Sequence, residues 1–351
     1  IRHRFLLPIT ALGLVTGMCV VLRSRRSLAT IAQVAGAAGV ILILLNLGRI
    51  GVDAISAPAG LSAEEETNVE VLNAAWEGKA LPDIYYIILD SYGRADSLMK
   101  THGYDNSSFI DSLTQKGFYV ATESRTNYIR TINSLGSSLN MRYLKDRDQR
   151  FPNMKNTTAL RTAKDLGYLY LHTDSGMWMS DRNQHADIEF LGDNPYEVLL
   201  NDFSSALLDS SVLAPVLAEV GLHLDELHSN KGALQFKHNM DILLTIPDYP
   251  EPTFTFNHNI VPHPPYVYDR NGNQPTDTTL PPGTVSEWQD VARYIDQLIY
   301  TNKRMEEFVD YVLDRSTVEP IIIIQGDHGP ASTCCTMGFS LKQHSTMALS
   351  F

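Results

Sequence analysis

The sequence predicts an α/β fold in which helices cover both faces of a mainly parallel central sheet. The first observation is a pair of short apolar runs, Ile84–Leu89 and Ile321–Ile324. Runs of this kind are typical of strands that are buried on both faces. The second observation is a long helical pattern from Ser286, whose apolar residues recur with a 3.6-residue period up to the second run. Strands that alternate with helices in this way indicate a parallel sheet.

The other elements follow the same alternation. Helices are expected at 106–116, from Thr131, at 157–166, at 203–219 and at 230–245, and strands at Phe118–Thr122, Tyr168–His172 and Thr253–Asn257. Residues 81–351 are therefore expected to form one folded domain. Residues 51–80, which include Pro58 and Gly60, are expected to be a linker.

Two uncharged apolar runs precede this domain, Phe5–Leu22 and Leu28–Gly48. Each is near the roughly 20 residues that a helix needs to cross a bilayer. We interpret residues 1–50 as a transmembrane hairpin, with a signal peptide as the alternative for the first run. The connection carries three arginines, which the positive-inside rule places in the cytoplasm. We therefore expect a multi-pass protein of the cell membrane with an extracytoplasmic domain, and, because residue 1 is not Met, a chain that begins inside a longer protein.

The charge distribution limits the possible partners. Residues 1–52 hold six of the 28 basic residues and no acid, so the rest of the chain carries 22 basic against 40 acidic side chains. Nucleic-acid binding needs Lys and Arg at the phosphates, so this balance argues against it and suits divalent cations better. The three cysteines, Cys19, Cys334 and Cys335, do not form a disulfide framework.

Polar residues follow both of the apolar runs. Asp90 comes directly after the first run, with Arg94 four residues later, and Asp327 and His328 follow the second. Ligands of open α/β sheets lie beyond the carboxyl ends of the strands, where a carboxylate and an imidazole are suitable metal ligands. Arg94 could clamp an anionic group. The alternatives are that Asp90 caps a helix near Arg94 and that the Asp-His pair is ordinary loop chemistry.

Three further candidates belong to a helix start and a loop. Thr131 is expected at the head of a helix, where backbone N–H groups favour an alkoxide and an anionic group, although an ordinary cap would look the same. His258 and His263 lie in a proline-rich loop after a predicted strand and are candidates for metal binding, protonation of a leaving group or anion contact. Together with the acids, these residues are sufficient for a nucleophile that a divalent cation activates.

Four segments in order resemble the alkaline phosphatase and sulfatase superfamily, and within it the membrane-anchored branch of lipoteichoic acid synthases and phosphoethanolamine transferases. They are Asp90-Ser91-Tyr92-Gly93-Arg94-Ala95-Asp96, Thr131-Ile132-Asn133-Ser134-Leu135, His258 to Tyr266 and Gly326-Asp327-His328-Gly329. The resemblance implies an alkaline phosphatase-like fold. It also implies a zinc or manganese ion bound by Asp90, Thr131, Asp327 and His328. Thr131 would form a phospho-Thr intermediate, and His263 would contact the transferred group or protonate the leaving alcohol, with Arg94 and His258 also in substrate binding.

The chain departs from the family pattern at three points. Position 90 is Asp where the closest transferases have Glu, which changes the ligand length and could change the choice of metal. No Cys or Ser stands in a C/S-x-P-x-R pattern, which disfavours a formylglycine-dependent sulfatase. After Pro330 little of the expected continuation follows, so the C-terminus is expected to be incomplete or altered, with His344 as a possible replacement for a late ligand.

The expected function is transfer of a phosphate-linked head group, of the phosphoethanolamine or phosphoglycerol type, from a lipid donor in the bilayer to a glycan or lipid acceptor. One alternative is a hydrolase of phosphoric or sulfuric esters on the same site, in which water replaces the acceptor. Another is a non-catalytic membrane protein that retains the fold.

Overall fold

The computed structural model describes residues 63–145, 152–177, 179–192, 224–275, 286–330 and 348–350, with short stretches before residue 46 and the single residues 211 and 281. Contacts divide the chain into two units, and the unit described below comprises Leu61–Ser205 and His223–Phe351. Most of the two predicted membrane runs, and nearly all of the predicted helix 203–219, lie outside the described residues. Residues 36–45 are helical. Among the described residues, no helix is both long and apolar enough to cross a membrane.

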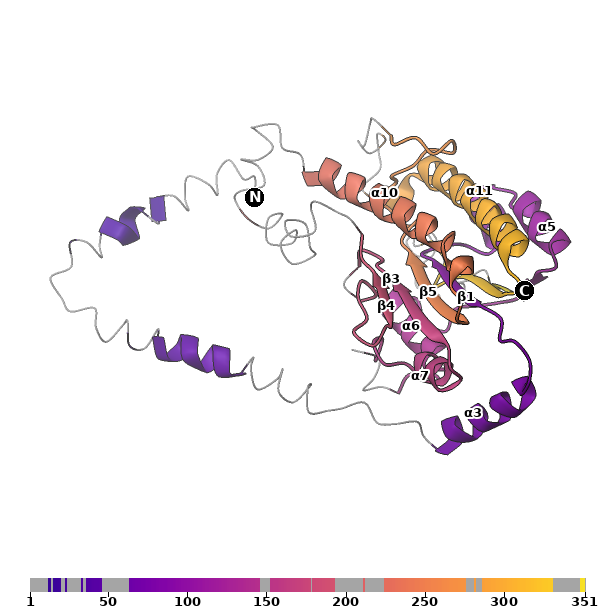
Figure 1. Ribbon diagram of the computed structural model, residues 1–351. Coiled ribbons are helices and arrows are strands. Elements are labelled where there is room, and N and C mark those ends of the chain that lie inside the picture. The colour runs from indigo at the N-terminus through magenta and orange to yellow at the C-terminus, as the bar shows by residue number, and fades with distance from the viewer. Residues whose placement is uncertain are drawn as a thin grey trace. The chain divides into compact units, whose positions relative to one another are not determined.

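A seven-stranded sheet in the order β2-β7-β6-β1-β5-β3-β4 forms the centre of this unit (Figure 1). Its strands are β1 (Ile84–Leu89), β2 (Tyr119–Val120), β3 (Leu169–Thr173), β4 (Ile188–Phe190), β5 (Thr253–Asn259), β6 (Ile321–Gly326) and β7 (Ala348–Ser350). β6, β1, β5, β3 and β4 pair in parallel, whereas β7 is antiparallel to both β6 and β2. The predicted mainly parallel sheet is confirmed.

Helices cover the sheet on both faces, as predicted. The helices of this unit are α3 (Ala63–Trp76), α4 (Ala95–His102), α5 (Ser107–Gln115), α6 (Thr131–Leu139), α7 (Thr158–Asp165), α10 (Leu224–Leu243) and α11 (Val291–Arg315), with the 3-10 turns η1 (Ile246–Asp248) and η2 (Glu287–Gln289). On one face, α5, α10 and α11 pack on a core that includes Tyr85, Ile87 and Leu89 of β1. On the other, α6 and α7 pack on a second core that includes Tyr86 and Ile88.

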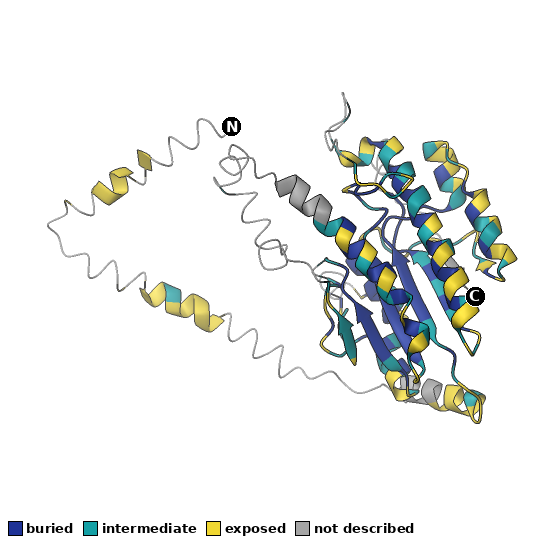
Figure 2. Ribbon diagram, turned by 45° about the horizontal axis from the view of Figure 1, so that its top comes forward, coloured by how far each residue is buried: buried dark blue, intermediate teal, exposed yellow. Residues whose placement is uncertain are grey.

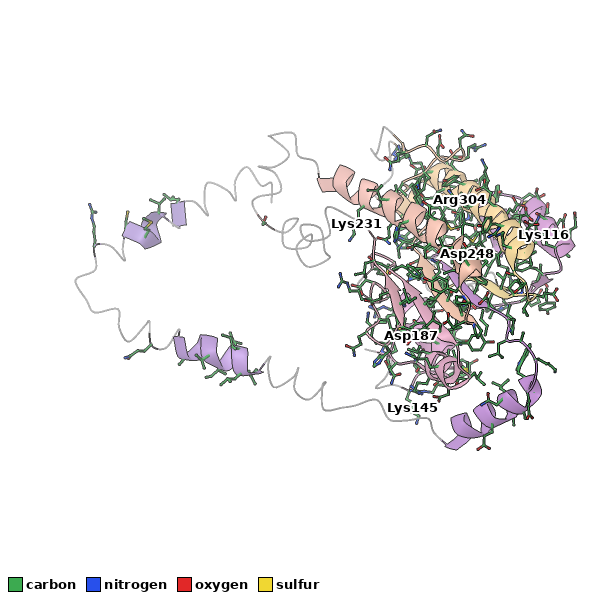
Figure 3. The ribbon with its side chains drawn as sticks, viewed as in Figure 1. Lys116, Lys145, Asp187, Lys231, Asp248 and Arg304 are labelled. Carbon is green, nitrogen blue, oxygen red and sulfur yellow. The ribbon has the colours of Figure 1, made fainter. Side chains whose placement is uncertain are left out.

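Figure 2 shows the central strands as buried elements between helices whose outer faces are exposed, whereas the edge strand β4 is only partly buried. Charged side chains hold the outer helices at their ends. Lys116 pairs with Asp310 at 3.1 Å and Arg315 pairs with Asp248 at 3.0 Å, so that α11 is tied to the turns after α5 and α10. Lys116 and Asp248 are among the residues labelled in Figure 3.

Two details of the prediction were wrong. β1 is buried on both faces, but of the four isoleucines of β6 only Ile322 and Ile324 are fully buried, while Ile321 and Ile323 are partly exposed. The reason is that the α6–α7 core lies over β1, β5 and β3 and reaches Ile323 only at its margin. The helix expected from Ser286 is also interrupted, because Ser286 caps the turn η2 and Asp290 starts α11 by accepting the N–H of Arg293.

Candidate active site

The strand register brings the predicted acids together. Leu89 of β1 lies opposite Gly326 of β6, so the next residues, Asp90 and Asp327, emerge side by side at the carboxyl edge of the sheet. Gly326 permits this approach, because a Cβ there would lie 2.6 Å from the carbonyl oxygen of Tyr92. Both carboxylates are fully buried.

Asp90, Asp327 and His328 each place one ligand atom within 4.8 Å of the others. The imidazole Nε2 of His328 lies 3.2 Å from Asp327 Oδ2 and 3.8 Å from Asp90 Oδ1. The Nδ1 atom of His328 lies 2.9 Å from the carbonyl oxygen of Gly329. A carbonyl can only accept, so this contact protonates Nδ1 and leaves the lone pair of the neutral ring on Nε2, directed at the two acids.

Thr131 joins this group from α6. Its Oγ1 atom lies 3.2 Å from Nε2 of His328. The cap position of α6 is held by Arg130, and the hydroxyl of Thr131 is directed at the imidazole. One turn later, the hydroxyl of Ser134 donates to the carbonyl oxygen of Asp327 at 2.5 Å, and Thr126 donates to the same oxygen at 2.8 Å. These bonds fix the head of α6 against the end of β6.

Ser91 completes the inner wall of the site and was missed from the sequence. Its φ of 62° is in the left-handed region, which is uncommon for a residue with a side chain. This turn directs its backbone N–H to Asp327 Oδ1 at 2.9 Å and its hydroxyl to Asp90 Oδ1 at 2.8 Å. Asp90 therefore does not cap α4, whose cap position is Arg94. No sequence signal marks Ser91, because glycine is the residue expected in such a turn.

Burial and neighbouring charges shift the pKa of both carboxylates and of His328. Burial raises the pKa of Asp327, and the charge of Asp90 raises it further. Burial alone would also raise the pKa of Asp90, but His263, His258 and His328 lower it well below its ordinary value. Burial opposes protonation of His328, yet Asp327 and Asp90 raise its pKa overall. Two buried acids with ligand atoms within 4.8 Å of each other repel when both are ionised.

This site meets the chemical requirements of a divalent cation. The outer Oδ2 oxygens of Asp90 and Asp327 are buried and have no hydrogen-bond partner. Buried charges in proteins are paired or bind metals, and two carboxylates, an imidazole nitrogen and a hydroxyl are donor groups that suit a divalent cation. The residues present therefore fit a divalent metal.

The remaining predicted residues surround this group. Three donors of Arg94 are engaged, two on the carboxylate of Asp96 and one on the carbonyl oxygen of Ser124 at 2.9 Å, so Arg94 braces the loop that leads to α6. The assignment of Arg94 to substrate binding stays a prediction. His258 belongs to β5 itself, not to the loop after it, and is fully buried with Nε2 3.7 Å from Asp90 Oδ2. His344 lies outside the described residues.

His263 lies in the loop after β5. Its Nδ1 donates to the carbonyl oxygen of Pro264, and its ring packs edge-on against Trp288 with centroids 4.7 Å apart. Because a carbonyl oxygen can only accept, Nδ1 of His263 carries the proton, and the lone pair of the neutral ring is on Nε2.

Gln297 of α11 holds this loop and was also missed from the sequence. Its Oε1 accepts from the backbone N–H groups of Val267 at 2.7 Å and Tyr268 at 3.1 Å. Its Nε2 donates to the carbonyl oxygens of Pro262 and His263, each at 3.2 Å. All four hydrogen-bonding positions of a fully buried amide are satisfied, so Gln297 ties the backbone on both sides of His263 to the helix.

Gln297→Met is expected to destabilise the protein by about 3 kcal/mol or more. It leaves three buried backbone groups and one partly buried group without partners, and each buried group costs about 1 kcal/mol or more. Thermal unfolding checks this, with Thr301→Val one turn along the same helix as the control. The hydroxyl of Thr301 bonds only to the carbonyl oxygen of Gln297, so its loss is expected to cost about 1 kcal/mol. Equal effects of the two substitutions would contradict the assignment.

A family model described as Sulfatase matches residues 82–347, more than half of the chain. The chain belongs to the sulfatase family. It is thus a member of the alkaline phosphatase superfamily and an enzyme that acts on phosphoric or sulfuric esters. The match continues past Pro330, where little of the family pattern was expected. A comparison with curated proteins finds no match.

Solved structures agree with this fold. The C-terminal periplasmic domain of EcEptC from Escherichia coli is 14% identical, with a TM-score of 0.50 over 78% of this chain and 73% of that one. The same domain in complex with Zn is 13% identical, with a TM-score of 0.50 over 78% of this chain and 73% of that one. The C-terminal periplasmic domain of phosphoethanolamine transferase EptC from Campylobacter jejuni is 10% identical, with a TM-score of 0.46 over 78% of this chain and 80% of that one. Lipoteichoic acid synthase LtaP from Listeria monocytogenes is 12% identical, with a TM-score of 0.47 over 77% of this chain and 65% of that one. The two structures with a TM-score of 0.50 agree with the α/β fold of this sulfatase-family chain.

Proposed function

We propose that this sulfatase-family enzyme transfers a phosphate-linked head group, of the phosphoethanolamine or phosphoglycerol type, from a lipid donor to an envelope acceptor through a phospho-Thr131 intermediate. The observation that carries the proposal is the convergence of the Thr131 hydroxyl with Asp90, Asp327 and His328 at the head of α6. A nucleophile at a helix N-terminus lies among backbone N–H groups that favour the binding of an anionic ester.

Asp90, Thr131, Asp327 and His328 would hold the cation, either zinc or manganese. When bound, such an ion lowers the pKa of a coordinated hydroxyl and stabilises the charge on the oxygens of a tetrahedral ester. Ser91 donates to the Oδ1 oxygens of both carboxylates, and the two Oδ2 oxygens are buried without a hydrogen-bond partner.

The proposed reaction has two halves. In the first, deprotonated Thr131 Oγ1 attacks phosphorus, the P–O bond to the donor breaks, and the donor alcohol leaves with a proton from His263. In the second, the acceptor hydroxyl gives its proton to His263 and attacks the same phosphorus, which releases Thr131. Electrostatic coupling between His263 and Asp90 supports a position for His263 near the reacting group.

Product analysis tests the transfer. Incubation with a lipid that carries a labelled head group is expected to label the acceptor when one is supplied, whereas free head-group phosphate as the dominant product with acceptor present would make the enzyme a hydrolase. Metal analysis tests the site itself: purified protein with neither zinc nor manganese, and no gain in thermal stability when either is added, would leave only a non-catalytic role.

The membrane association is part of the same proposal. Residues 1–50 would anchor the chain and place the domain outside the cytoplasm, which is supported by the two apolar runs and the arginines between them. Release of the full chain from membranes by alkaline carbonate would contradict the anchor, and a reporter fused after residue 60 that is active only in the cytoplasm would contradict the orientation.

A further inference from the structure

A buried chain of polar side chains approaches the outer side of Asp90. It contains Ser175 and Ser180 from the segment after β3 and His258 from β5, and all three are at least 97% buried. The hydroxyl of Ser180 lies 2.7 Å from Nδ1 of His258 and 2.9 Å from the hydroxyl of Ser175. Nε2 of His258 lies 3.7 Å from Asp90 Oδ2, and neither of these two buried atoms has a hydrogen-bond partner.

His172 of β3 fixes the backbone of Ser180. Its Nε2 lies 3.1 Å from the carbonyl oxygen of Ser180, which can only accept, so Nε2 carries a proton. Its Nδ1 then accepts from the hydroxyl of Tyr170 at 2.9 Å. Burial lowers the pKa of His172 to about 4, which keeps this ring in the neutral form that the two contacts require. Ser180 is therefore held rigidly, with its hydroxyl directed at His258.

The tautomer of His258 follows from the atoms that face it. If Nδ1 carried the proton, the Nε2 lone pair would face a buried carboxylate oxygen, and both acceptors would lack a donor. If Ser180 donates to Nδ1, Ser175 can donate to Ser180, and the Nε2–H of His258 points at Asp90 Oδ2. The 3.7 Å separation is longer than a hydrogen bond, so a closer approach of less than 1 Å is needed to form one.

We propose that Ser180 and His258 form a positioning relay that orients the Asp90 carboxylate for metal binding. Ser91 holds the inner oxygen of this carboxylate at 2.8 Å, and the backbone N–H of Asp90 is bonded to the carbonyl oxygen of Asn259 at 2.9 Å. The outer oxygen is the part of Asp90 that remains to be oriented, and His258 is the donor that faces it. The relay rests on the proposed metal-dependent function and adds a positioning role for two buried residues on the outer side of Asp90.

Two substitutions of His258 separate positioning from direct ligation. The amide nitrogen of His258→Gln can take the place of Nε2 and keep a donor toward Asp90, whereas the shorter His258→Asn reaches only the place of Nδ1. Ser180→Ala removes the group that selects the tautomer. Thr255→Val is the control, because Thr255 is fully buried on the same strand and its hydroxyl has no partner. Dissociation constants for Zn²⁺ and Mn²⁺ would be measured on the full chain in detergent by chelator competition.

We expect His258→Asn and Ser180→Ala to weaken metal binding by about 10- to 100-fold, which is typical for residues that orient a ligand. His258→Gln is expected to stay within about 3-fold of the unmodified protein, on the scale of a retained hydrogen bond, and Thr255→Val to bind as the unmodified protein does. An equal loss in the Gln and Asn variants would make His258 a direct ligand and overturn the relay. Unchanged affinity in the Asn and Ser180→Ala variants would also overturn it.

Nitrogen NMR of ¹⁵N-histidine-labelled protein gives a second readout that needs no metal. The His258 signals, assigned by their absence from the spectrum of His258→Gln, are expected to show a protonated Nε2 and an unprotonated Nδ1. Ser180→Ala is expected to change the proportion of the two neutral tautomers. A protonated Nδ1 in the unmodified protein would overturn the relay. If the protein binds no metal but shows the expected tautomer, the proposed function fails while the orientation of His258 toward Asp90 stands.

Discussion

Thr131→Ala is expected to abolish head-group transfer and to remove the covalent label from the protein. The substitution deletes the attacking oxygen of the proposed phospho-Thr131 intermediate, and a loss of about 10³-fold or more is expected for a missing nucleophile. The measurement is a short incubation with a donor labelled at phosphorus, followed by denaturation and recovery of label on the peptide that contains Thr131.

Thr131→Ser is the matched control. It keeps the hydroxyl that faces His328 and deletes one methyl group from a largely buried position, so labelling is expected to persist at a reduced rate. Ser134→Ala tests the positioning of α6 without removing the proposed nucleophile. The hydroxyl of Ser134 ties α6 to the carbonyl oxygen of Asp327 and takes no part in the proposed reaction. Label that persists on the Thr131→Ala protein would show that another residue is the nucleophile.

The sequence predicted the parts of the site that depend on strand ends. Asp90 and Asp327 each follow a strongly apolar run, and parallel strands bring their carboxyl ends to one edge of the sheet, so their proximity could be expected before any coordinates. The 4.8 Å grouping of Asp90, Asp327 and His328 agrees with that expectation.

The parts that could not be predicted depend on tertiary contacts. Ser91 acts through a left-handed backbone, Gln297 acts on a loop about 30 residues away in sequence, and Ser180 contacts His258 across 78 positions. Each is a common polar residue with no local pattern around it. The predicted strand ended at Asn257, which placed His258 in the loop after it. In the structure Asn257 is buried and bonded to Thr173, and β5 continues to Asn259. A buried amide that is hydrogen-bonded can lie within a strand, so a search for apolar residues alone predicts a strand that is too short.

The second large effect concerns Asp327→Asn, for which metal affinity and metal-free stability are expected to change in opposite directions. An asparagine Oδ1 can still accept from the backbone N–H groups of Ser91 and His328, at 2.9 and 2.8 Å in the present structure. Its amide nitrogen replaces an unpartnered buried oxygen beside Asp90. Because the substitution removes a buried acid whose ionisation is opposed by burial and by the charge of Asp90, the metal-free variant is expected to be at least as stable as the metal-free unmodified protein.

Metal binding is expected to fall by at least about 100-fold in the same variant, because loss of a ligand should exceed the 10- to 100-fold cost of losing a residue that only orients one. A cation that binds only the folded state stabilises it by about 2.7 kcal/mol at 100 times its dissociation constant, and this gain should disappear in Asp327→Asn. Thermal unfolding with a chelator and with added Zn²⁺ or Mn²⁺ measures both effects. A variant that is destabilised without metal yet retains the full metal-dependent gain would show that Asp327 supports the fold and does not bind the cation.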